Sequence, residues 1–290
     1  TFVPALLAWA VSVALVSSSA WAMHETIVEV SVPLERQSAF SVTPAQARAE
    51  LEKTPGGVTV VDARDYLNGR AGTMDDTLKL AAGVFIQSRF GSDEARVSIR
   101  GSGLQRTFHG RGLMLLQDGV PLNLADGGFD MQAVEPGATR YVEVQRGANA
   151  LRYGSSTLGG AINYLSQTGR SAPALLLRAE AGSFDYQRYQ IAAGGEQGDV
   201  DGYASFSHIE QDGFRDHARQ RNGRFFGNLG FQLTPHVESR FYTTVVDTSS
   251  ELPGNLSYAD VKTNPRKAEA GSLNRDTKRD FQLYRLANRT

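Results

Sequence analysis

The last third of the chain alternates apolar and polar residues with a period of two, and this pattern limits the possible folds more than any other feature. Apolar residues recur at every second position within residues 175–181, 189–193 and 225–233. Segments of about ten residues with this period predict β-strands that have one apolar and one polar face. Aromatic residues lie toward the ends of these segments, as the interfacial girdles of a membrane barrel require. They are Tyr186, Tyr203, Phe225, Phe226 and Tyr242.

The connections between the expected strands alternate in length. Residues 195–199 and 234–236 form short connections, residues 211–222 a longer one, and residues 248–280 a very long polar one. Short turns on one side and long loops on the other are typical of an outer-membrane β-barrel. A soluble β-sandwich is the competing interpretation, but it does not readily explain the long loop. We predict about six transmembrane strands in residues 171–290, too few to close around a globular domain, and we expect further strands beyond the last residue.

The first 22 residues have the features of an export signal. Residues 2–16 are almost wholly apolar, and Ala20-Trp21-Ala22 has the small-x-small form that signal peptidase recognises. The apolar run is too short for a comfortable transmembrane helix, although a short membrane anchor is the alternative. Because the chain opens with Thr1 and lacks a basic n-region, we expect the true start to lie upstream and the mature chain to begin near Met23.

Composition argues against several classes of function. The formal net charge is −1, so nothing indicates binding to a nucleic-acid backbone, and the chain has no cysteine for disulfides or thiolate sites. The five histidines show no metal-ligand spacing, and Gly101-Ser102-Gly103 lacks the pattern of a nucleophile elbow. We therefore expect no enzymatic activity, no catalytic residue, no cofactor and no metal site.

The pattern of short expected strands and one helix in residues 51–170 predicts a compact α+β domain. Thr73 is a candidate N-cap for a helix over residues 77–82, which Gly83 ends, and Asp118-Gly119 is a tight-turn pair. Short strands are expected over residues 57–61, 96–100, 113–117, 141–144 and 161–165.

Four motifs of this domain occur in the order found in the plug of TonB-dependent outer-membrane receptors, which the chain resembles. They are Val97-Ser98-Ile99-Arg100-Gly101, then Leu115-Leu116-Gln117-Asp118-Gly119-Val120-Pro121-Leu122, then Val142-Glu143-Val144-Gln145-Arg146-Gly147-Ala148-Asn149-Ala150-Leu151-Arg152-Tyr153-Gly154, and then Ser155-Ser156-Thr157-Leu158-Gly159-Gly160-Ala161-Ile162-Asn163. The resemblance implies an α+β plug domain followed by antiparallel transmembrane β-barrel strands, the first part of a barrel of about 22 strands. The residues that it marks as structural in the plug are Arg100, Gly101, Asp118, Gly119, Arg146, Gly147, Tyr153, Gly154, Gly159 and Gly160.

The resemblance also implies two kinds of contact between plug and barrel. In the family, arginines such as Arg100 and Arg146 pair with acidic groups of the barrel. Glycines permit positive φ and close backbone approach, and we expect those at positions 147, 154, 159 and 160 to do so where the plug packs against the barrel wall.

A six-residue segment near the start resembles the TonB box, the energy-coupling peptide of the family. It comprises Glu25, Thr26, Ile27, Val28, Glu29 and Val30, with Glu29 where a valine is usual. Its β-branched residues favour an extended peptide, which would bind TonB by adding a strand to the edge of the partner's sheet. We predict that the rest of residues 23–50, which is polar and contains Pro33 and Pro44, forms a flexible tether.

Three plug loops supply the candidate ligand-binding residues. They are Arg89, Phe90, Gln105, Arg106, His109, Arg111 and Asn123. Guanidinium groups match carboxylate oxygens in pairs, so the arginines suit an anionic chelate, while the amides and the imidazole add hydrogen bonds. An ordinary solvated loop is the alternative for any one of these residues.

The resemblance implies a receptor in the outer membrane of a Gram-negative cell that imports a ferric chelate into the periplasm. Its expected partners are TonB with the inner-membrane complex that energises it, the chelate, and outer-membrane lipid. Glu251-Leu252-Pro253-Gly254 resembles the ferric-dicitrate and siderophore group. Ferric citrate is therefore the first expected ligand, followed by other ferric siderophores, other metal chelates and cobalamin. The alternative function is that of a truncated, non-transporting remnant or a secreted ligand-binding module.

Overall fold

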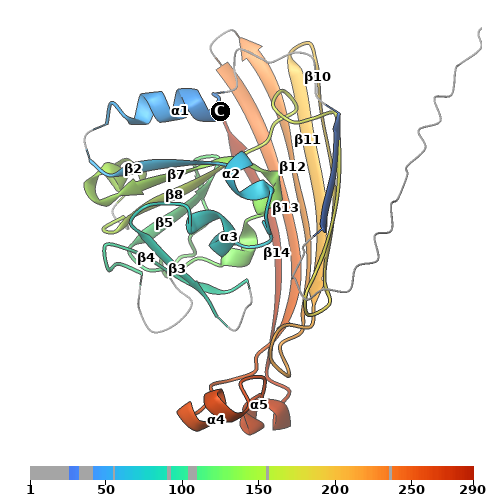
Figure 1. Ribbon diagram of the computed structural model, residues 1–290. Helices are drawn as coiled ribbons and strands as arrows, with labels where there is room; N and C mark the ends of the chain where they lie inside the picture. The colour runs from blue at the N-terminus through green and yellow to red at the C-terminus, as the bar shows by residue number, and fades with distance from the viewer. Residues whose placement is uncertain are drawn as a thin grey trace, which may run out of the picture.

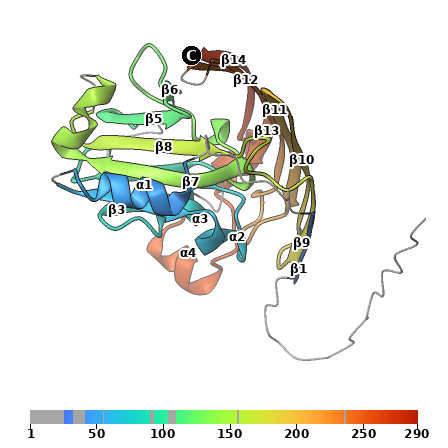
Figure 2. The ribbon, with the colours of Figure 1, turned by 90° about the horizontal axis from the view of Figure 1, so that it is seen from above.

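The computed structural model describes residues 26–32, 42–54, 56–89, 93–103, 110–154, 157–234 and 237–290. A globular body, residues 42–170, lies against the concave face of a curved antiparallel sheet (Figure 1, Figure 2). We call these two parts the plug and the wall. The predicted export signal, residues 1–22, lies outside the described residues, as do Glu25, Phe90, Gln105, Arg106 and His109.

The plug is built on a five-stranded sheet in the order β2-β7-β8-β5-β6. These strands are β2 (Val58–Asp62), β5 (Leu113–Gln117), β6 (Val120–Pro121), β7 (Thr139–Arg146) and β8 (Gly160–Ser166). All pairs are antiparallel except β5 with β8, which are parallel. A separate antiparallel pair, β3 (Val84–Ser88) and β4 (Ala95–Ile99), shares the same hydrophobic core. Ile99, Leu113, Val144 and Ile162 are completely buried there.

Local sequence signals place the turns and helices of the plug. Asp118 and Gly119 have φ of 53° and 79° and form the two-residue turn between β5 and β6, as predicted. Thr73 caps α3 (Met74–Leu78) through a capping box with Asp76, so this helix begins at Met74 and not at residue 77. The other short helices are α2 (Arg64–Leu67) and three 3-10 segments, Met131–Ala133, Pro136–Ala138 and Gly147–Tyr153.

The helix α1 (Pro44–Leu51) belongs to the plug and not to the predicted tether. It begins with a capping box between Thr43 and Gln46, and Pro44 occupies its first turn. Its one buried residue, Ala47, packs with Val60 of β2 and Tyr141 of β7. The tether prediction therefore does not hold for residues 44–50. Within the described ranges, no helix is both long enough and apolar enough to cross a membrane.

The wall consists of β9 to β14, paired antiparallel in sequence order. These strands are β9 (Leu175–Gly182), β10 (Tyr186–Gln197), β11 (Val200–Gln211), β12 (Gln220–Thr234), β13 (Val237–Glu251) and β14 (Lys278–Arg289). A two-residue turn joins β10 to β11, whereas the connection from β13 to β14 contains α4 (Tyr258–Thr263) and α5 (Ala270–Asn274). The short turn and the long connection lie at opposite ends of the wall (Figure 1), in agreement with the predicted alternation.

The strand β1 (Thr26–Val32) extends the wall at the free edge of β9. The two strands pair antiparallel, from Thr26 opposite Ala181 to Val32 opposite Leu175. This strand contains most of the predicted coupling peptide, and its extended backbone is the conformation that β-branched residues favour.

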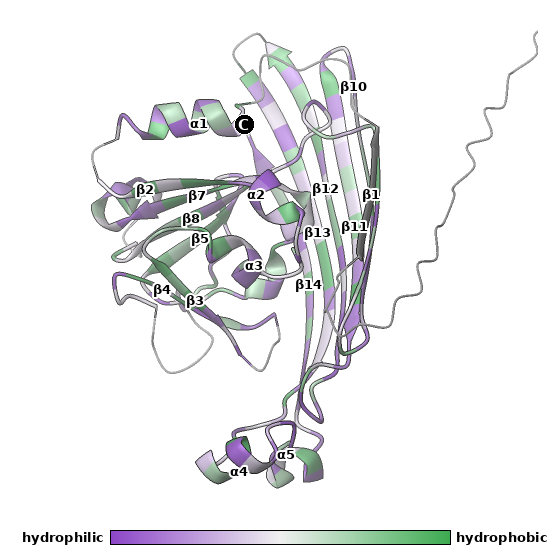
Figure 3. Ribbon diagram, viewed as in Figure 1, coloured by the Kyte–Doolittle hydropathy of each residue, from purple (hydrophilic) through white to green (hydrophobic). Residues whose placement is uncertain are grey.

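Most large apolar side chains of the wall point away from the plug. Four aromatic residues are exceptions, because they are buried on the side of the plug: Tyr186, Tyr203, Phe226 and Tyr242. The predicted role in interfacial girdles therefore does not hold for these four. The large exposed apolar residues on its strands include Tyr189, Ile191, Phe206, Leu229, Phe241, Tyr284 and Leu286. The buried polar residues on the side of the plug include Arg188, Gln190, Ser205, Ser207, Arg224 and Arg240. Figure 3 shows hydrophobic and hydrophilic residues alternating along these strands. Strands with an apolar outer face and a polar inner face are those of a membrane barrel, which confirms the predicted class of a plug followed by antiparallel barrel strands.

Phe206, midway along β11, tests the outward orientation of this face. Phe206→Arg is expected to lower the free energy of unfolding from lipid by about 2–4 kcal/mol, which is a destabilisation, because the charge would lie near the bilayer midplane. Val200→Arg changes an exposed residue on the same face at the turn end of the strand, where a cost of about 0–1 kcal/mol is expected. Urea unfolding of the full protein in lipid vesicles measures both costs, and equal values would contradict this orientation.

Candidate functional site

Glu135 of the plug lies at the centre of a buried ionic network that joins the plug to the wall. Its carboxylate oxygens lie 3.1 Å from Nη2 of Arg188 on β10 and 3.7 Å from Nη1 of Arg224 on β12. Ser207 on β11 donates its hydroxyl group to the same carboxylate. The side chains of Glu135, Arg188 and Arg224 are each at most 3% exposed. One plug carboxylate therefore bridges three neighbouring wall strands.

A second carboxylate, Glu180 on β9, completes the environment of Arg188. Nη1 of Arg188 lies 3.1 Å from Glu180, and Tyr186 donates its hydroxyl group to Glu180 over 2.9 Å. Arg178 also pairs with Glu180 and donates to the carbonyl oxygen of Gly69 in the plug over 3.0 Å. Buried charges are costly unless they are paired and hydrogen-bonded, so these partners explain how the arginines are accommodated.

Asp93 and Glu94 attach the β3–β4 pair to the wall through Arg224 and Arg279. Arg224 lies 2.5 Å from Asp93. Arg279, at the start of β14, pairs with Glu94 and lies 2.7 Å from Asp130. Burial raises the pKa of the Asp93 carboxyl above its ordinary value, although the nearby Arg224 opposes that rise. The plug thus presents carboxylates to arginines of the wall.

This polarity differs from the one that the family resemblance implies for Arg100 and Arg146. Arg170, at the end of the plug, does pair with wall carboxylates, at 3.5 Å from Glu196 and 3.3 Å from Asp201. Arg146 donates to Oγ1 of Thr59 over 2.7 Å and to the carbonyl oxygen of Ala82 over 2.6 Å, both inside the plug. Arg100 is exposed and lies against Gly147, where a Cβ atom would come within 2.5 Å of its Nη1. Among the described residues, neither Arg100 nor Arg146 forms an ion pair with a carboxylate. The expected pairing of these two arginines with acidic barrel groups is therefore not met by β9 to β14.

The glycines expected to touch the wall include two that pack within the plug. A Cβ atom on Gly159 would lie 2.4 Å from Ser102, and one on Gly160 would lie 2.4 Å from the carbonyl oxygen of Gln145. Gly137, which the sequence did not single out, approaches the wall instead, since a Cβ atom there would lie 2.5 Å from the guanidinium group on β10. Gly147 lies against Arg100 of the plug, and a Cβ atom on Gly154 would have no neighbour within 4 Å. Among the described residues, none of the four predicted glycines approaches the wall. Tyr153 lies beside a small cluster of buried plug residues.

Asp118 fastens the β5–β6 turn to β8 and to the wall. Its carboxylate accepts hydrogen bonds from the N–H group of Ser166 over 2.9 Å and from its hydroxyl group over 2.7 Å. Arg289, near the end of β14, donates to the carbonyl oxygen of Asp118 over 2.9 Å. The N–H group of Gly119 donates to Oδ1 of Asn163 over 2.9 Å. The turn predicted from sequence is thus a docking point as well as a chain reversal.

A cavity of about 370 Å³ opens beside this turn, at the end of the wall opposite α4 and α5. Its charged lining residues are Arg140, Arg170, Arg240, Arg289, Asp118 and Glu238. Arg240 already pairs with Asp201 and Glu238, and Arg170 pairs with Asp201 and Glu196. Arg140 and Arg289 are therefore the guanidinium groups of this lining that an anionic group could contact.

The structure describes three of the predicted ligand-binding residues. The guanidinium group of Arg89 lies 3.9 Å from Glu94, which also pairs with the arginine at the start of β14. Arg89 therefore lies toward the end of the wall that carries α4 and α5. Arg111 lies 3.9 Å from Asp126, and its side chain is 57% exposed. The two arginines are associated with different acidic residues on different loops.

Asn123, the third of these residues, has a structural role. Its Oδ1 accepts from the N–H group of Leu115 over 2.8 Å, and its Nδ2 donates to the carbonyl oxygens of Leu113 over 2.9 Å and Gly127 over 3.0 Å. Both amide protons are thus engaged, which leaves this side chain little capacity to bind a ligand.

Comparison with known sequences gives one family and several relatives. Residues 50–161 match the TonB-dependent Receptor Plug Domain family. The chain is 29% identical over 252 residues to the hemin receptor of Yersinia enterocolitica, an alignment that covers 80% of this chain and 34% of that protein. It is 27% identical over 169 residues to the vitamin B12 transporter BtuB of Vibrio cholerae, which covers 57% of this chain and 27% of that protein. The chain thus spans about a third or less of these relatives.

Solved structures share the fold. The ferric citrate transporter FecA in its unliganded form superimposes with a TM-score of 0.64 at 18% identity, over 78% of this chain and 36% of that one. A mutant of the ferric enterobactin receptor PfeA from Pseudomonas aeruginosa gives a TM-score of 0.57 at 15% identity, over 83% of this chain and 39% of that one.

Glu135→Gln tests the energetic importance of the network. This substitution is expected to destabilise the docked plug by about 1–3 kcal/mol, because it removes one carboxylate from two buried arginines that keep Glu180 and Asp93 as partners. Glu50→Gln is the matched control, since Glu50 forms an exposed ion pair with Lys53 that contributes about 0–1 kcal/mol. Hydrogen exchange of plug amides in the detergent-solubilised protein measures both effects, and equal protection in the two variants would contradict this role of Glu135.

Proposed function

Residues 50–161 match the TonB-dependent Receptor Plug Domain family, and the fold is that of solved receptors. We therefore propose that the chain forms part of a TonB-dependent outer-membrane receptor that imports a metal chelate into the periplasm. The observation that carries this proposal is the position of the plug against the polar inner face of a wall whose outer face is apolar. That arrangement suits strands that span lipid and enclose a plug.

The connections of the wall suggest its orientation. Outer-membrane barrels carry long loops outside the cell and short turns in the periplasm. We therefore assign the end with α4 and α5 to the outside and the β10–β11 turn to the periplasm. In this orientation Arg89 lies toward the outside, and the arginine-lined cavity lies toward the periplasm. An anionic chelate would meet guanidinium groups at both ends of the plug.

We further propose a carboxylate-bearing ferric chelate, such as ferric dicitrate or another ferric siderophore, as the ligand. Arg89 and Arg111 supply donors that match carboxylates in pairs. The relatives, named as a hemin receptor and a vitamin B12 transporter, favour metal chelates as a class. Hemin, which also carries carboxylates, and cobalamin are the competing ligands.

TonB is the proposed source of energy, through residues 25–30. The described part of this segment lies in β1, which pairs with the edge of β9. Its backbone can therefore take the extended form that adds a strand to a sheet. A force applied there would reach the plug through α1, which packs on β2 and β7.

Deleting residues 25–30 is expected to abolish uptake and to leave ligand binding intact, because the coupling peptide lies apart from the ligand-facing loops. Ile27→Pro is a finer test, since proline removes a backbone donor that strand addition requires, whereas Ile27→Val keeps it. Uptake and surface binding of radiolabelled ferric citrate by whole cells separate the two functions. Unimpaired uptake by the deletion variant would refute the coupling assignment.

Growth of cells that lack or carry the gene, on ferric citrate, a ferric siderophore or hemin as the sole iron source, distinguishes the candidate ligands. Growth that depends on the gene with ferric citrate or the siderophore alone supports the proposed ligand class. Dependence with hemin alone would contradict it. The mass of the natural product tests the alternative of a non-transporting remnant, because a product no heavier than this chain would favour that alternative.

A further inference from the structure

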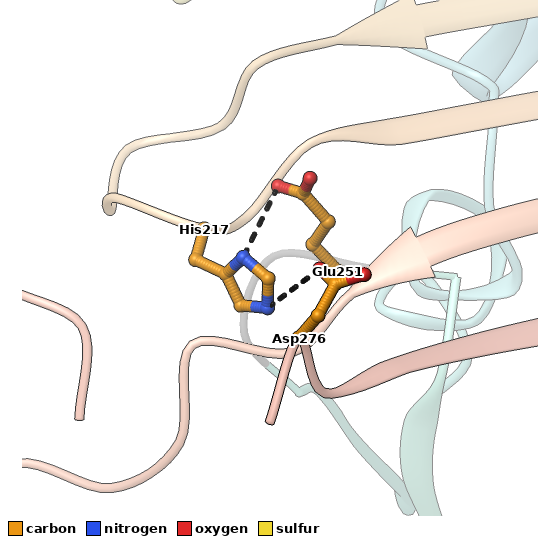
Figure 4. Close-up of side chains that lie close together, drawn as sticks. All are labelled: His217, Glu251 and Asp276. Atoms are coloured by element: carbon orange, nitrogen blue, oxygen red, sulfur yellow. Dashed lines mark ion pairs between the residues drawn. The ribbon is translucent and has the colours of Figure 1, made fainter. Parts of the chain in front are cut away.

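Three potential metal ligands, two from connections and one from the end of a strand, meet at the end of the wall that carries α4 and α5. They are His217, in the connection between β11 and β12, Glu251, the last residue of β13, and Asp276, which lies shortly before β14 (Figure 4). Their ligand atoms all lie within 4.8 Å of one another. We propose that these residues bind a divalent metal ion of the zinc type, which fastens the two connections together. This site goes beyond the proposed transport function.

The histidine ring is oriented as a metal ligand would be. Its side chain is only 10% exposed, and its Nε2 lies 3.0 Å from the carbonyl oxygen of Thr277. When Nε2 carries the proton and donates to that carbonyl, Nδ1 presents a lone pair. A backbone carbonyl that fixes the second nitrogen in this way is the usual support of a metal-binding histidine.

The Nδ1 atom faces a carboxylate without a hydrogen bond between them. Oε2 of Glu251 lies 3.8 Å from Nδ1, beyond the distance of a hydrogen bond. In the tautomer described above, both atoms are acceptors, so a cation between them would convert a repulsion into two bonds. Zinc bonds of about 2.0–2.2 Å would bring the ligand atoms roughly 3.3 Å apart. For Nδ1 and Oε2 of Glu251 this is a small contraction, whereas Asp276 now faces Nε2 and would have to rotate toward the ion.

Asp276 would supply the third ligand. Its Oδ1 lies 4.0 Å from Nε2 of His217, and its side chain is 66% exposed, which leaves it room to rotate toward the ion. Two neighbouring groups compete for these carboxylates. Lys278 pairs with Oδ2 of Asp276 at 3.3 Å, and the N–H group of Arg219 donates to Oε2 of Glu251 over 3.0 Å. Each carboxylate has a second oxygen, so neither contact uses up its capacity.

The donor set selects the kind of ion. One imidazole and two carboxylates suit zinc and related first-row divalent ions, whereas calcium and magnesium prefer oxygen ligands alone. Sequence spacing predicted no metal site because the three residues lie far apart along the chain. The fold brings them together by placing β11, β12, β13 and β14 side by side.

The surrounding contacts show which parts the ion would hold in place. Arg215 donates to the carbonyl oxygens of Gly254 over 2.6 Å and Lys267 over 2.8 Å. Phe214 packs edge-to-face on Phe184, with ring centroids 5.6 Å apart. The connections before β10, β12 and β14 therefore already lie against one another. A metal ion would add a strong link to this contact.

Isothermal titration of the detergent-solubilised protein with zinc chloride tests the proposal directly. One zinc ion per chain is expected to bind, and calcium chloride is expected to give no binding. Glu251→Gln, which preserves shape, and His217→Ala are each expected to weaken zinc binding at least tenfold. His208→Ala, which removes a histidine of β11 outside the cluster, is the matched control and is expected to leave the affinity unchanged. Zinc binding that survives both His217→Ala and Glu251→Gln, or no zinc binding by the unaltered protein, would overturn the proposal.

Limited proteolysis of the connection that contains α4 and α5 distinguishes a metal ion from a proton at the same place. Zinc is expected to slow cleavage at least severalfold at constant pH, and a chelator is expected to restore the original rate. Cleavage that changes with pH but not with zinc would show that a protonated His217 bridges the carboxylates, and would contradict the metal assignment.

Discussion

The plug is held in the wall by a carboxylate that three neighbouring strands share. Glu135 contacts Arg188, Ser207 and Arg224, and these side chains have no access to bulk water. In such surroundings an unpaired charge costs several kcal/mol, whereas a paired and hydrogen-bonded charge is tolerated. The position of the plug therefore determines whether the buried arginines of the wall have partners. Each part leaves charges unpaired when the other is absent.

The need to pair buried charges also explains why the wall is apolar on its outer face and charged on its inner face. Its outer side chains are apolar, as strands in lipid require, so its charged residues must point inward. Within the described ranges the plug supplies partners for several of them, through Asp93, Glu94, Asp130 and Glu135 and through carbonyl groups such as that of Gly69. Among the described residues, the interface combines these ionic contacts with a small apolar cluster, in which Ala138 of the plug packs with Tyr203 and Phe226 of the wall.

The sequence predicts the parts of this architecture that depend on local chemistry. Apolar and polar residues alternate along β9 to β14 because one face meets lipid and the other meets the plug. The turn at Asp118-Gly119 is predictable because these two residue types tolerate the positive φ values that a tight turn requires. The helix α1 was missed because it buries only Ala47 and otherwise reads as polar, although Thr43, Pro44 and Gln46 carry the signal of a helix start. The ionic network was missed because Asp93 and Arg224 are far apart in the chain and become neighbours only in the fold. Asn123 was predicted to bind ligand because the sequence alone does not distinguish a polar loop residue that faces solvent from one that bonds to the backbone of its own hairpin.

A double-mutant cycle on Asp93 and Arg224 tests the central claim most directly. Asp93→Asn, Arg224→Gln and the double variant would be compared by the free energy of plug opening, obtained from hydrogen exchange in the full detergent-solubilised protein. If the plug is docked by buried pairs of plug carboxylates and wall arginines, the two substitutions are coupled by about 1.5 kcal/mol or more. Strictly additive effects would show that the two residues act independently, and would contradict this account of how the plug is held.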